Sequence, residues 1–146
     1  DLEGRPVPVN YWGEQSEIIR LQRLLEKDDA LRSPEVDEAQ ERQRRILESA
    51  TAASLNDGRY DLATSAYYRA LAELLEATQY ARLTDFYAER DRRIAENAIA
   101  AVSFLQRARP DVGGRILFAV GADHRGPLVE ALRRRFGDDV RLVPVP

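Results

Sequence analysis

The stretch RILFAVGADHRGP, residues 115–127, decides the fold that this sequence predicts. Its apolar run, Ile116–Val120, is typical of a β-strand that is covered on both faces. Gly121 then allows a sharp turn, and Asp123 and His124, the single histidine of the chain, follow it. The stretch therefore predicts a buried strand with two chemically active side chains at its carboxyl end.

The residues after this stretch predict a helix and a second strand. The segment GPLVEALRRRFG is amphipathic, with Pro127 near its start and Gly137 at its end, as expected for a short helix. The segment DDVRLVPV, residues 138–145, then predicts a strand. A strand–helix–strand unit with such short loops implies parallel strands joined by a right-handed crossover.

A further strand is predicted near the start of the chain, in RPVPVN, Arg5–Asn10. Pro6 and Pro8 are two residues apart, so their missing N–H groups fall on the same side of a strand. Pro144 and Pro146 repeat this spacing at the end of the chain. Proline is tolerated in this way only on an unpaired edge. The three strands therefore predict a small parallel sheet whose two edges carry the prolines.

Four amphipathic helices are predicted between the first two strands. The second of them begins at Ser33 as a cap, with Pro34 at the first helical position and Glu35 near the positive end of the helix dipole. The four helices are expected at residues 14–28, 33–55, 61–77 and 84–109.

The expected architecture is one α/β domain over residues 1–146. A helical segment at 12–110 is inserted between the first and second strands, and residues 1–11 and 111–146 form the sheet part. The chain lacks methionine, and DLEGRPVPVN resembles the last turn of a helix, a Gly4 cap and a strand. We therefore expect part of a longer chain, with a missing N-terminal half or a second subunit as its partner.

Composition excludes several classes of function. The net charge is -3, with 32% charged and 44% hydrophobic residues, which argues against nucleic acid as a partner because phosphate binding needs a basic face. There is no cysteine, so disulfides and thiolate metal sites are excluded. No run of about 18 apolar residues is present, so no membrane span is expected.

Asp123 and His124 are the first candidates for a functional site. Ligands of open parallel sheets bind beyond the carboxyl ends of the strands, and the helix that follows offers free N–H groups. Histidine can transfer a proton or bind a metal near neutral pH. The alternative is a histidine that merely hydrogen-bonds the backbone of a turn. A metal would need further ligands beyond His124, since zinc takes three or four.

The segment AERDRRIAENA, residues 88–98, supplies the next candidate. One interpretation places Arg90 inward, beside His124, where it would position an anion or a carboxylate. The alternative is a solvated helix face on which Glu89, Arg93 and Glu96 form ion pairs.

Aromatic residues offer a different kind of site. Trp12 is predicted to line a pocket near the end of the first strand, with Glu14 as an acid, base or ligand, or else to pack the helices onto the sheet. Tyrosines at helical spacing are more often core than a site for haem or another flat ligand. They are Tyr60, Tyr67, Tyr68, Tyr80 and Tyr87.

Together, ERDRRIAE, VGADH, GPLVEALRRRFG and VRLVPV resemble the C-terminal part of the TraB/GumN/ChaN/Tiki-like superfamily. Arg90-Asp91 matches an Arg-Asn or Arg-Asp pair on a helix, and Gly121 and His124 match a Gly-x-x-His strand end. The family pattern often has Asn at the position of Asp91 and Met at that of Ile94. The first half of the family pattern, with its own Gly-x-x-His, has no match here.

The resemblance implies activities that differ widely: metal-dependent peptidase, haem binding, shutdown of a peptide pheromone, or an esterase-like reaction. It leads to a first hypothesis of a hydrolase-like enzyme, assisted by a divalent metal on His124. His124, Asp123 and Arg90 would be its catalytic residues. The alternatives are a non-catalytic module that binds haem or a similar ligand, and a structural partner domain.

ILFAVGADHRGP also resembles the opening of type B ribose-5-phosphate isomerases. That family builds its sheet after the motif, whereas only 22 residues follow His124 here. The catalytic cysteine of that family has no counterpart. We interpret the likeness as the same turn at the end of a strand in two families.

Overall fold

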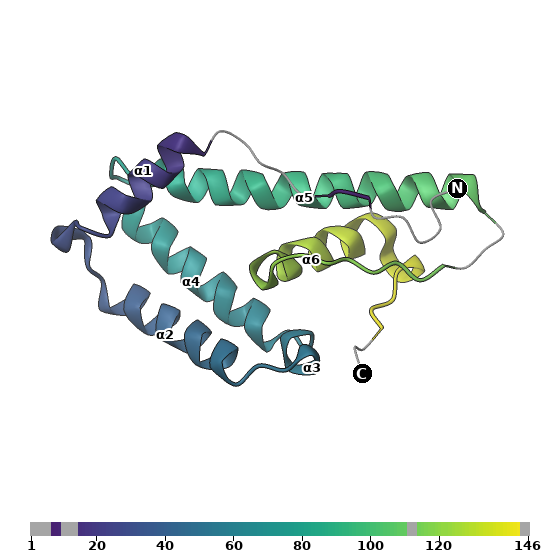
Figure 1. The fold of residues 1–146 in the computed structure, drawn as a ribbon, viewed down its shortest axis with the longest axis horizontal. Coiled ribbons are helices and arrows are strands. Elements are labelled where there is room, and N and C mark those ends of the chain that lie inside the picture. Colours follow the sequence, from purple (N-terminus) through teal and green to yellow (C-terminus); the bar gives the residue numbers. More distant parts are fainter. Residues whose placement is uncertain (1–6, 10–14, 111–113, 144–146) are drawn as a thin grey trace.

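The computed structural model describes residues 7–9, 15–110 and 114–143. Within these ranges every regular element is helical (Figure 1). The long helix α5, Ala81–Ala108, runs the length of the molecule, and α6, Arg125–Phe136, lies along its second half. The helices α2, Pro34–Glu48, and α4, Arg59–Leu75, pack against each other, and α4 also packs against α5 and α6.

The first predicted helix is confirmed as α1, Ser16–Leu25, which buries Ile18 and Leu21 and packs on α5. A short 3-10 turn, η1, Asp29–Leu31, leads to α2. The predicted start of α2 is also confirmed. The Ser33 hydroxyl accepts a hydrogen bond from the Val36 N–H, and proline occupies the first turn, so the cap satisfies one of the donors that every helix start leaves free.

The helix expected from 33 to 55 is wrong in its second half. It ends at Glu48, and a separate turn of helix, α3, spans Ala52–Leu55. Thr51 and Ser54 explain the break, because each side chain accepts a hydrogen bond from the other's backbone N–H. This reciprocal capping box marks the start of a new helix. The apolar spacing continues across the break between α2 and α3, so the spacing alone does not reveal that start.

The third and fourth predicted helices are α4 and α5. Gly58, at φ 91°, precedes α4 and takes a left-handed conformation that favours glycine. The helix α6 ends as expected at Gly137, which has φ 56°. Two 3-10 turns flank α6: η2, Ala122–His124, directly before it, and η3, Gly137–Asp139, directly after it.

Two hydrophobic clusters share α5. The first joins α1, α2, α4 and the start of α5, and includes Leu75 and Leu83, both almost wholly buried. The second joins the later part of α5 to α6 through Ala98 and Leu128. Because both clusters rest on one helix, the middle of α5 is held between them.

The predicted α/β fold with a parallel sheet is wrong, since no strand is present in residues 7–9, 15–110 or 114–143. The buried strand expected at 115–120 is irregular backbone. The described parts of the other two predicted strands, residues 7–9 and 140–143, form no strand either. Their remaining residues lie outside the described ranges.

Packing explains this correction. The predicted central strand needed cover on both faces, yet Leu117 is 89% exposed and Ile116 is 45% exposed. Phe118 and Val120 instead pack onto the α5–α6 cluster. The carbonyl of Val9 accepts a hydrogen bond from the Asn97 side chain on α5. These segments therefore lie on helices, and a continuous apolar run does not specify which kind of partner it packs against.

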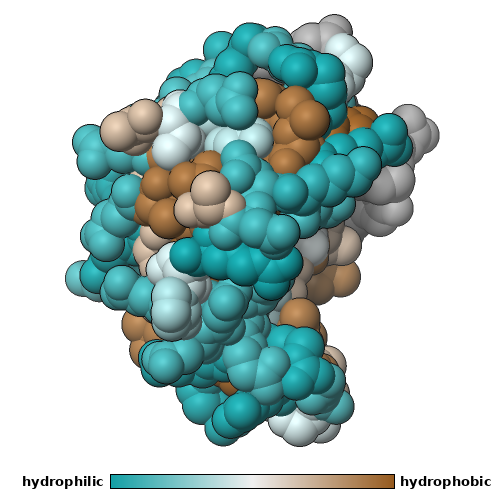
Figure 2. Space-filling view, turned by 90° about the vertical axis from the view of Figure 1, so that its left-hand side faces the viewer, coloured by the Kyte–Doolittle hydropathy of each residue, from teal (hydrophilic) through white to brown (hydrophobic). Residues whose placement is uncertain are grey.

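Among the described residues, no helix combines the length and the apolar character needed to cross a bilayer. On the face that carries α1, Figure 2 shows small hydrophobic patches separated by hydrophilic side chains. Ile19 and Leu24 of α1 are exposed hydrophobic residues. Scattered apolar residues of this kind are normal on a protein surface.

Two leucines of α4 provide a test of this packing. Leu75→Ala removes a side chain with 0% exposure and should lower the free energy of unfolding by about 2–5 kcal/mol. Leu62→Ala, on the same helix but 75% exposed, should change it by less than about 0.5 kcal/mol. Urea unfolding followed by circular dichroism measures both. Equal losses would contradict the placement of α4.

Candidate functional site

His124 is paired with Asp91. Its Nδ1 atom lies 2.6 Å from Asp91 Oδ1, and the two side chains are 17% and 22% exposed. Asp91 projects from the middle of α5, whereas His124 is the last residue of η2 and directly precedes α6. Since a carboxylate accepts and does not donate, the Nδ1 atom carries the hydrogen, and Nε2 of a neutral imidazole keeps its lone pair.

Asp123 forms a second cluster beside this pair. Its Oδ1 atom accepts hydrogen bonds from the Tyr60 hydroxyl at 2.6 Å and from Gln43 Nε2 at 3.4 Å. Its Oδ2 atom accepts one from the Tyr68 hydroxyl at 3.3 Å. Gln43 also donates to the Thr64 hydroxyl at 3.0 Å. Asp123 thus connects η2 to both α2 and α4, and its carboxylate receives neutral donors from each.

The two tyrosines remain protonated donors over a wide pH range. Burial raises the pKa of Tyr60 to about 12, and the hydrogen bond to Asp123 adds to the effect. Burial, followed by the charge of Asp123, also raises the pKa of Tyr68 well above its ordinary value. Deprotonation would place a phenolate beside the carboxylate, which low local polarity makes unfavourable.

Arg125, the residue after His124, fixes the start of α6 on α4. Its guanidinium forms a partly buried ion pair with Asp61 and donates to the backbone carbonyl of Asn56 at 2.6 Å. Gly126 allows this close approach, since a Cβ atom there would lie 3.1 Å from the Cβ atom of Asp61. The turn that carries Asp123 and His124 is therefore held in two ways, by the hydrogen bonds of Asp123 to α2 and α4 and by the ion pair of Arg125 with α4.

A cavity of about 310 Å³ lies next to these residues. Its walls come from α4, α5, η2 and the first turn of α6. Asp91 and Asp123 line it, so the cavity reaches the carboxylate of the histidine pair and the Asp123 cluster, whereas His124 itself is not among the lining residues. The other lining residues are Asp61, Thr64, Ser65, Tyr68, Ala72, Thr84, Tyr87, Ala88 and Pro127.

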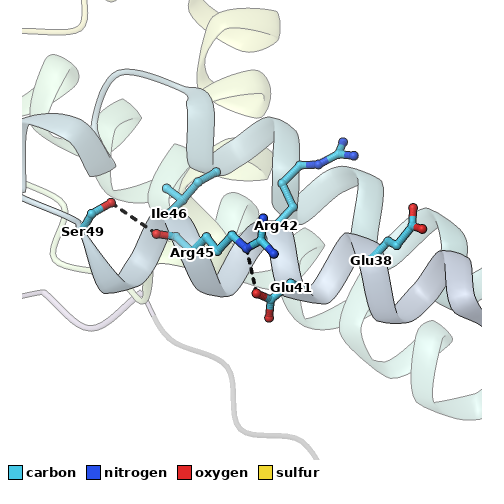
Figure 3. A pocket seen from close by; sticks show the side chains of 6 residues that line it. All are labelled: Glu38, Glu41, Arg42, Arg45, Ile46 and Ser49. Atoms are coloured by element: carbon cyan, nitrogen blue, oxygen red, sulfur yellow. Dashed lines mark hydrogen bonds and ion pairs between the residues drawn. The ribbon is translucent and has the colours of Figure 1, made fainter.

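A second hollow, of about 390 Å³, does not have the character of a site. Figure 3 shows the six side chains along it: five belong to α2, and the sixth, Ser49, is the residue that caps the end of this helix. Their polar groups are occupied locally, with Arg45 Nε donating to Glu41 at 2.7 Å and the Ser49 hydroxyl donating to the Arg45 carbonyl at 3.2 Å. Among the described residues, no second helix contributes a side chain to its lining, and none of the predicted site residues lines it.

The donor set does not fit the expected metal. In the described parts of the chain, no group of three or more His, Cys, Asp and Glu side chains is placed to hold a metal ion. The Nδ1 atom of His124 is engaged by Asp91, and the oxygens of Asp123 accept from tyrosine and glutamine donors. His124 as a metal ligand stays a prediction, and no chemistry is derived through a metal below.

The ion-paired helix face is the interpretation of the segment around Arg90 that the structure confirms. Glu89 pairs with Arg92 and Arg93 at 2.6 and 2.8 Å on the outer face of α5, and the hydrogen bonds of these arginines lower the pKa of Glu89 to about 2. Arg90 differs from this solvated face, because it is partly buried and its Nε atom is shielded from solvent. Its role as an anion clamp stays a prediction.

Most of the tyrosines serve the core or the Asp123 cluster. Tyr80 donates to Asp28 at 2.9 Å. The rings of Tyr67, Tyr68 and Tyr87 contact one another in succession, tilted by 57° and 54°, with centroid distances of 5.3 and 5.5 Å. Tyr87 and Gln22 are hydrogen-bonded. The predictions for Trp12 and Glu14 fall outside the described residues.

Sequence reasoning named His124 and Asp123 but missed their partners. Asp91 appeared only as the neighbour of Arg90, and neither Gln43 nor Asp61 was singled out. The sequence offered a signal for Asp91, because the family resemblance matches Arg90-Asp91 to a pair of residues on a helix. Gln43 carries no comparable signal, because it lies 80 residues from Asp123 in the chain.

Comparisons with protein-family models, with curated proteins and with solved structures yield no match to this chain. The resemblance to the TraB/GumN/ChaN/Tiki-like superfamily therefore stays a prediction carried by short motifs.

The Asp123 cluster can be tested through tyrosine titration. In Asp123→Asn the charge that opposes phenolate formation is lost, so Tyr60 and Tyr68 should titrate at lower pH, although burial keeps them above ordinary tyrosines. Tyrosinate absorbance in an alkaline titration reports this shift. The exposed Asp138→Asn should leave the curve unchanged, and a shift of the same size there would contradict the assignment.

The raised pKa of Tyr60 also predicts how stability depends on pH. Its pKa is about 12 in the folded chain against 10.0 ordinarily, so the folded state holds this proton more tightly. The corresponding stability is complete below pH 10 and is lost as the pH rises through about 12. In Tyr60→Phe, the loss of stability over this window, measured by urea unfolding, should therefore be smaller. An unchanged loss would contradict the assignment.

Proposed function

We propose that the chain is a hydrolase-like enzyme in which His124, oriented by Asp91, acts as the general base. The observation that carries the proposal is the 2.6 Å contact between His124 Nδ1 and Asp91 Oδ1 beside a cavity. A carboxylate on one imidazole nitrogen fixes the tautomer and turns the other nitrogen into a base. Hydrolysis of an ester or amide needs such a group to activate water.

The proposed reaction uses one proton transfer in each direction. Nε2 of His124 accepts a proton from water as the water oxygen attacks the carbonyl carbon of the substrate. The imidazolium formed is stabilised by the Asp91 carboxylate. It then returns the proton to the leaving oxygen or nitrogen as the bond to the carbonyl carbon breaks. The base is regenerated, and one water is consumed for each bond cleaved.

The other two predicted catalytic residues take different roles in this proposal. Asp123 is a positioning residue, since its oxygens accept hydrogen bonds from Tyr60, Tyr68 and Gln43 and so hold the turn that carries His124. Arg90 keeps its predicted role as the residue that binds an anionic group, on the strength of the family resemblance and of its partly buried position on α5. A metal-assisted version is not developed, because the described donors do not form a metal site.

The haem-binding alternative has less support. The hydroxyls of Tyr60, Tyr68 and Tyr80 are engaged with carboxylates, so they are not free to meet an iron atom. A partner-domain role is the second candidate, and the exposure of Leu117 at 89% favours it. With a second subunit as the partner, sedimentation equilibrium should show association that weakens in Leu117→Ser.

Because His124 is the only histidine, imidazole nitrogen NMR reads its state directly. The neutral ring should show the tautomer protonated at Nδ1, since this nitrogen faces Asp91. In Asp91→Asn the side-chain amide can also donate to the ring, so the preference for this tautomer should weaken. Asp85→Asn, an exposed change on the same helix, should preserve it. A ring protonated at Nε2 in the unaltered protein would contradict the proposed base.

Catalysis is tested on a panel of nitrophenyl esters and anilides. His124→Ala should reduce kcat/KM for any substrate turned over by about 10²- to 10⁴-fold, as expected for loss of a general base, and should leave Tm nearly unchanged. Asp91→Asn should lower kcat more than it changes KM, because it acts on the tautomer. Asp85→Asn is the control.

Two outcomes would overturn the proposed function. One is a large loss of stability in His124→Ala with its hydrolytic activity intact. The other is the absence of hydrolysis of every panel member by the unaltered protein.

A further inference from the structure

The cavity beside the histidine pair is suited to a ligand of defined charge. Its volume of about 310 Å³ lies at the lower end of the range for small-molecule sites. It is formed where α4, α5 and the start of α6 meet, so rigid helices define its walls. This is a better foundation for a binding site than the hollow on α2, which one helix forms alone.

The charge of the cavity wall is negative. Three carboxylates line it, those of Asp61, Asp91 and Asp123, and none of its lining residues is basic. Arg125 compensates Asp61, and His124 compensates Asp91 when it is protonated. The hydrogen bonds to Asp123 come from the neutral donors Tyr60, Tyr68 and Gln43, so they do not cancel its negative charge.

One atom adds a second indication. Asp61 Oδ1 is buried and has no hydrogen-bond donor among the described residues, although the other oxygen of this carboxylate pairs with Arg125. An acceptor buried without a donor costs free energy, and its negative potential extends into the neighbouring space. Because this atom has almost no exposed surface, a positive ligand in the cavity would act on it through its charge and not through a direct hydrogen bond.

The remaining walls match an organic cation better than a bare metal ion. Hydroxyl groups of Thr64, Ser65 and Thr84 can accept hydrogen bonds from an ammonium or guanidinium group. The rings of Tyr68 and Tyr87 lie on the same wall, with centroids 5.5 Å apart. Aromatic faces attract cations and also cover the apolar part of such a ligand.

We propose that this cavity binds a small organic cation with an ammonium or guanidinium group, held by the carboxylates of α4 and α5 and by the tyrosine rings. The further claim that such a cation is the substrate rests on the proposed function. The cation would lie toward Asp61, and its hydrolysable bond would lie toward the Asp91–His124 pair.

Binding is measured by calorimetry with three matched probes: benzylammonium, benzyl alcohol and benzoate. Benzylammonium should bind at least about tenfold more tightly than the neutral alcohol, a difference of about 1.4 kcal/mol, and benzoate should bind most weakly. Equal affinities for all three probes, or no binding of benzylammonium, would overturn the assignment.

A filled cavity provides the site-specific control. Ala88 lines the cavity from α5, so Ala88→Leu should weaken benzylammonium binding at least tenfold. Ala100→Leu is the matched change at an exposed position of the same helix, and it should leave binding unchanged. Equal effects of the two variants would place the ligand elsewhere and overturn the proposal.

The failure of this inference is distinguishable from failure of the proposed function. Calorimetry requires no turnover, so His124→Ala should still bind benzylammonium. Hydrolysis without selective binding of the cation would overturn the cavity assignment alone. Selective binding of the cation without any hydrolysis would overturn the proposed hydrolytic function and support the proposed binding site.

Discussion

The carboxylate of Asp123 is the constraint on which the site depends. A carboxylate removed from water is unfavourable unless hydrogen bonds compensate it, and here the donors come from α2 and α4, through Gln43, Tyr60 and Tyr68. The next residue is His124, so the same contacts that satisfy Asp123 also bring the imidazole to Asp91. Loss of these contacts would leave the Arg125–Asp61 ion pair to hold the start of α6 on α4.

The helix α5 gives the site its rigid side. It carries one hydrophobic cluster with α1, α2 and α4 and another with α6, and Asp91 lies between them. Buried Ile94 and Ala95 hold the helix just beyond Asp91. Because neighbouring packing fixes both partners, the Asp91–His124 pair is preorganised, which is the condition under which an acid–base pair is effective.

Local signals predicted the helices well and the sheet wrongly. Apolar spacing and caps such as Ser33 and Gly137 act within a few residues, so the sequence displays them directly. A sheet requires hydrogen-bonding partners far along the chain, and an apolar run such as Ile116–Val120 is compatible with other packing. In the structure Phe118 and Val120 meet helices, whereas Leu117 stays exposed.

The sequence by itself determined the start of α2 at Ser33, the end of α6 at Gly137 and the lack of thiol groups in this chain, and it singled out Asp123 and His124 as candidates. These depend on composition and on neighbours within a turn of helix. Only the tertiary structure decided which groups meet them, because Asp91 is 33 residues from His124 and Tyr60 is 63 residues from Asp123. Contacts at that separation follow from how α4, α5 and α6 pack, and the periodicity of each helix leaves that packing open.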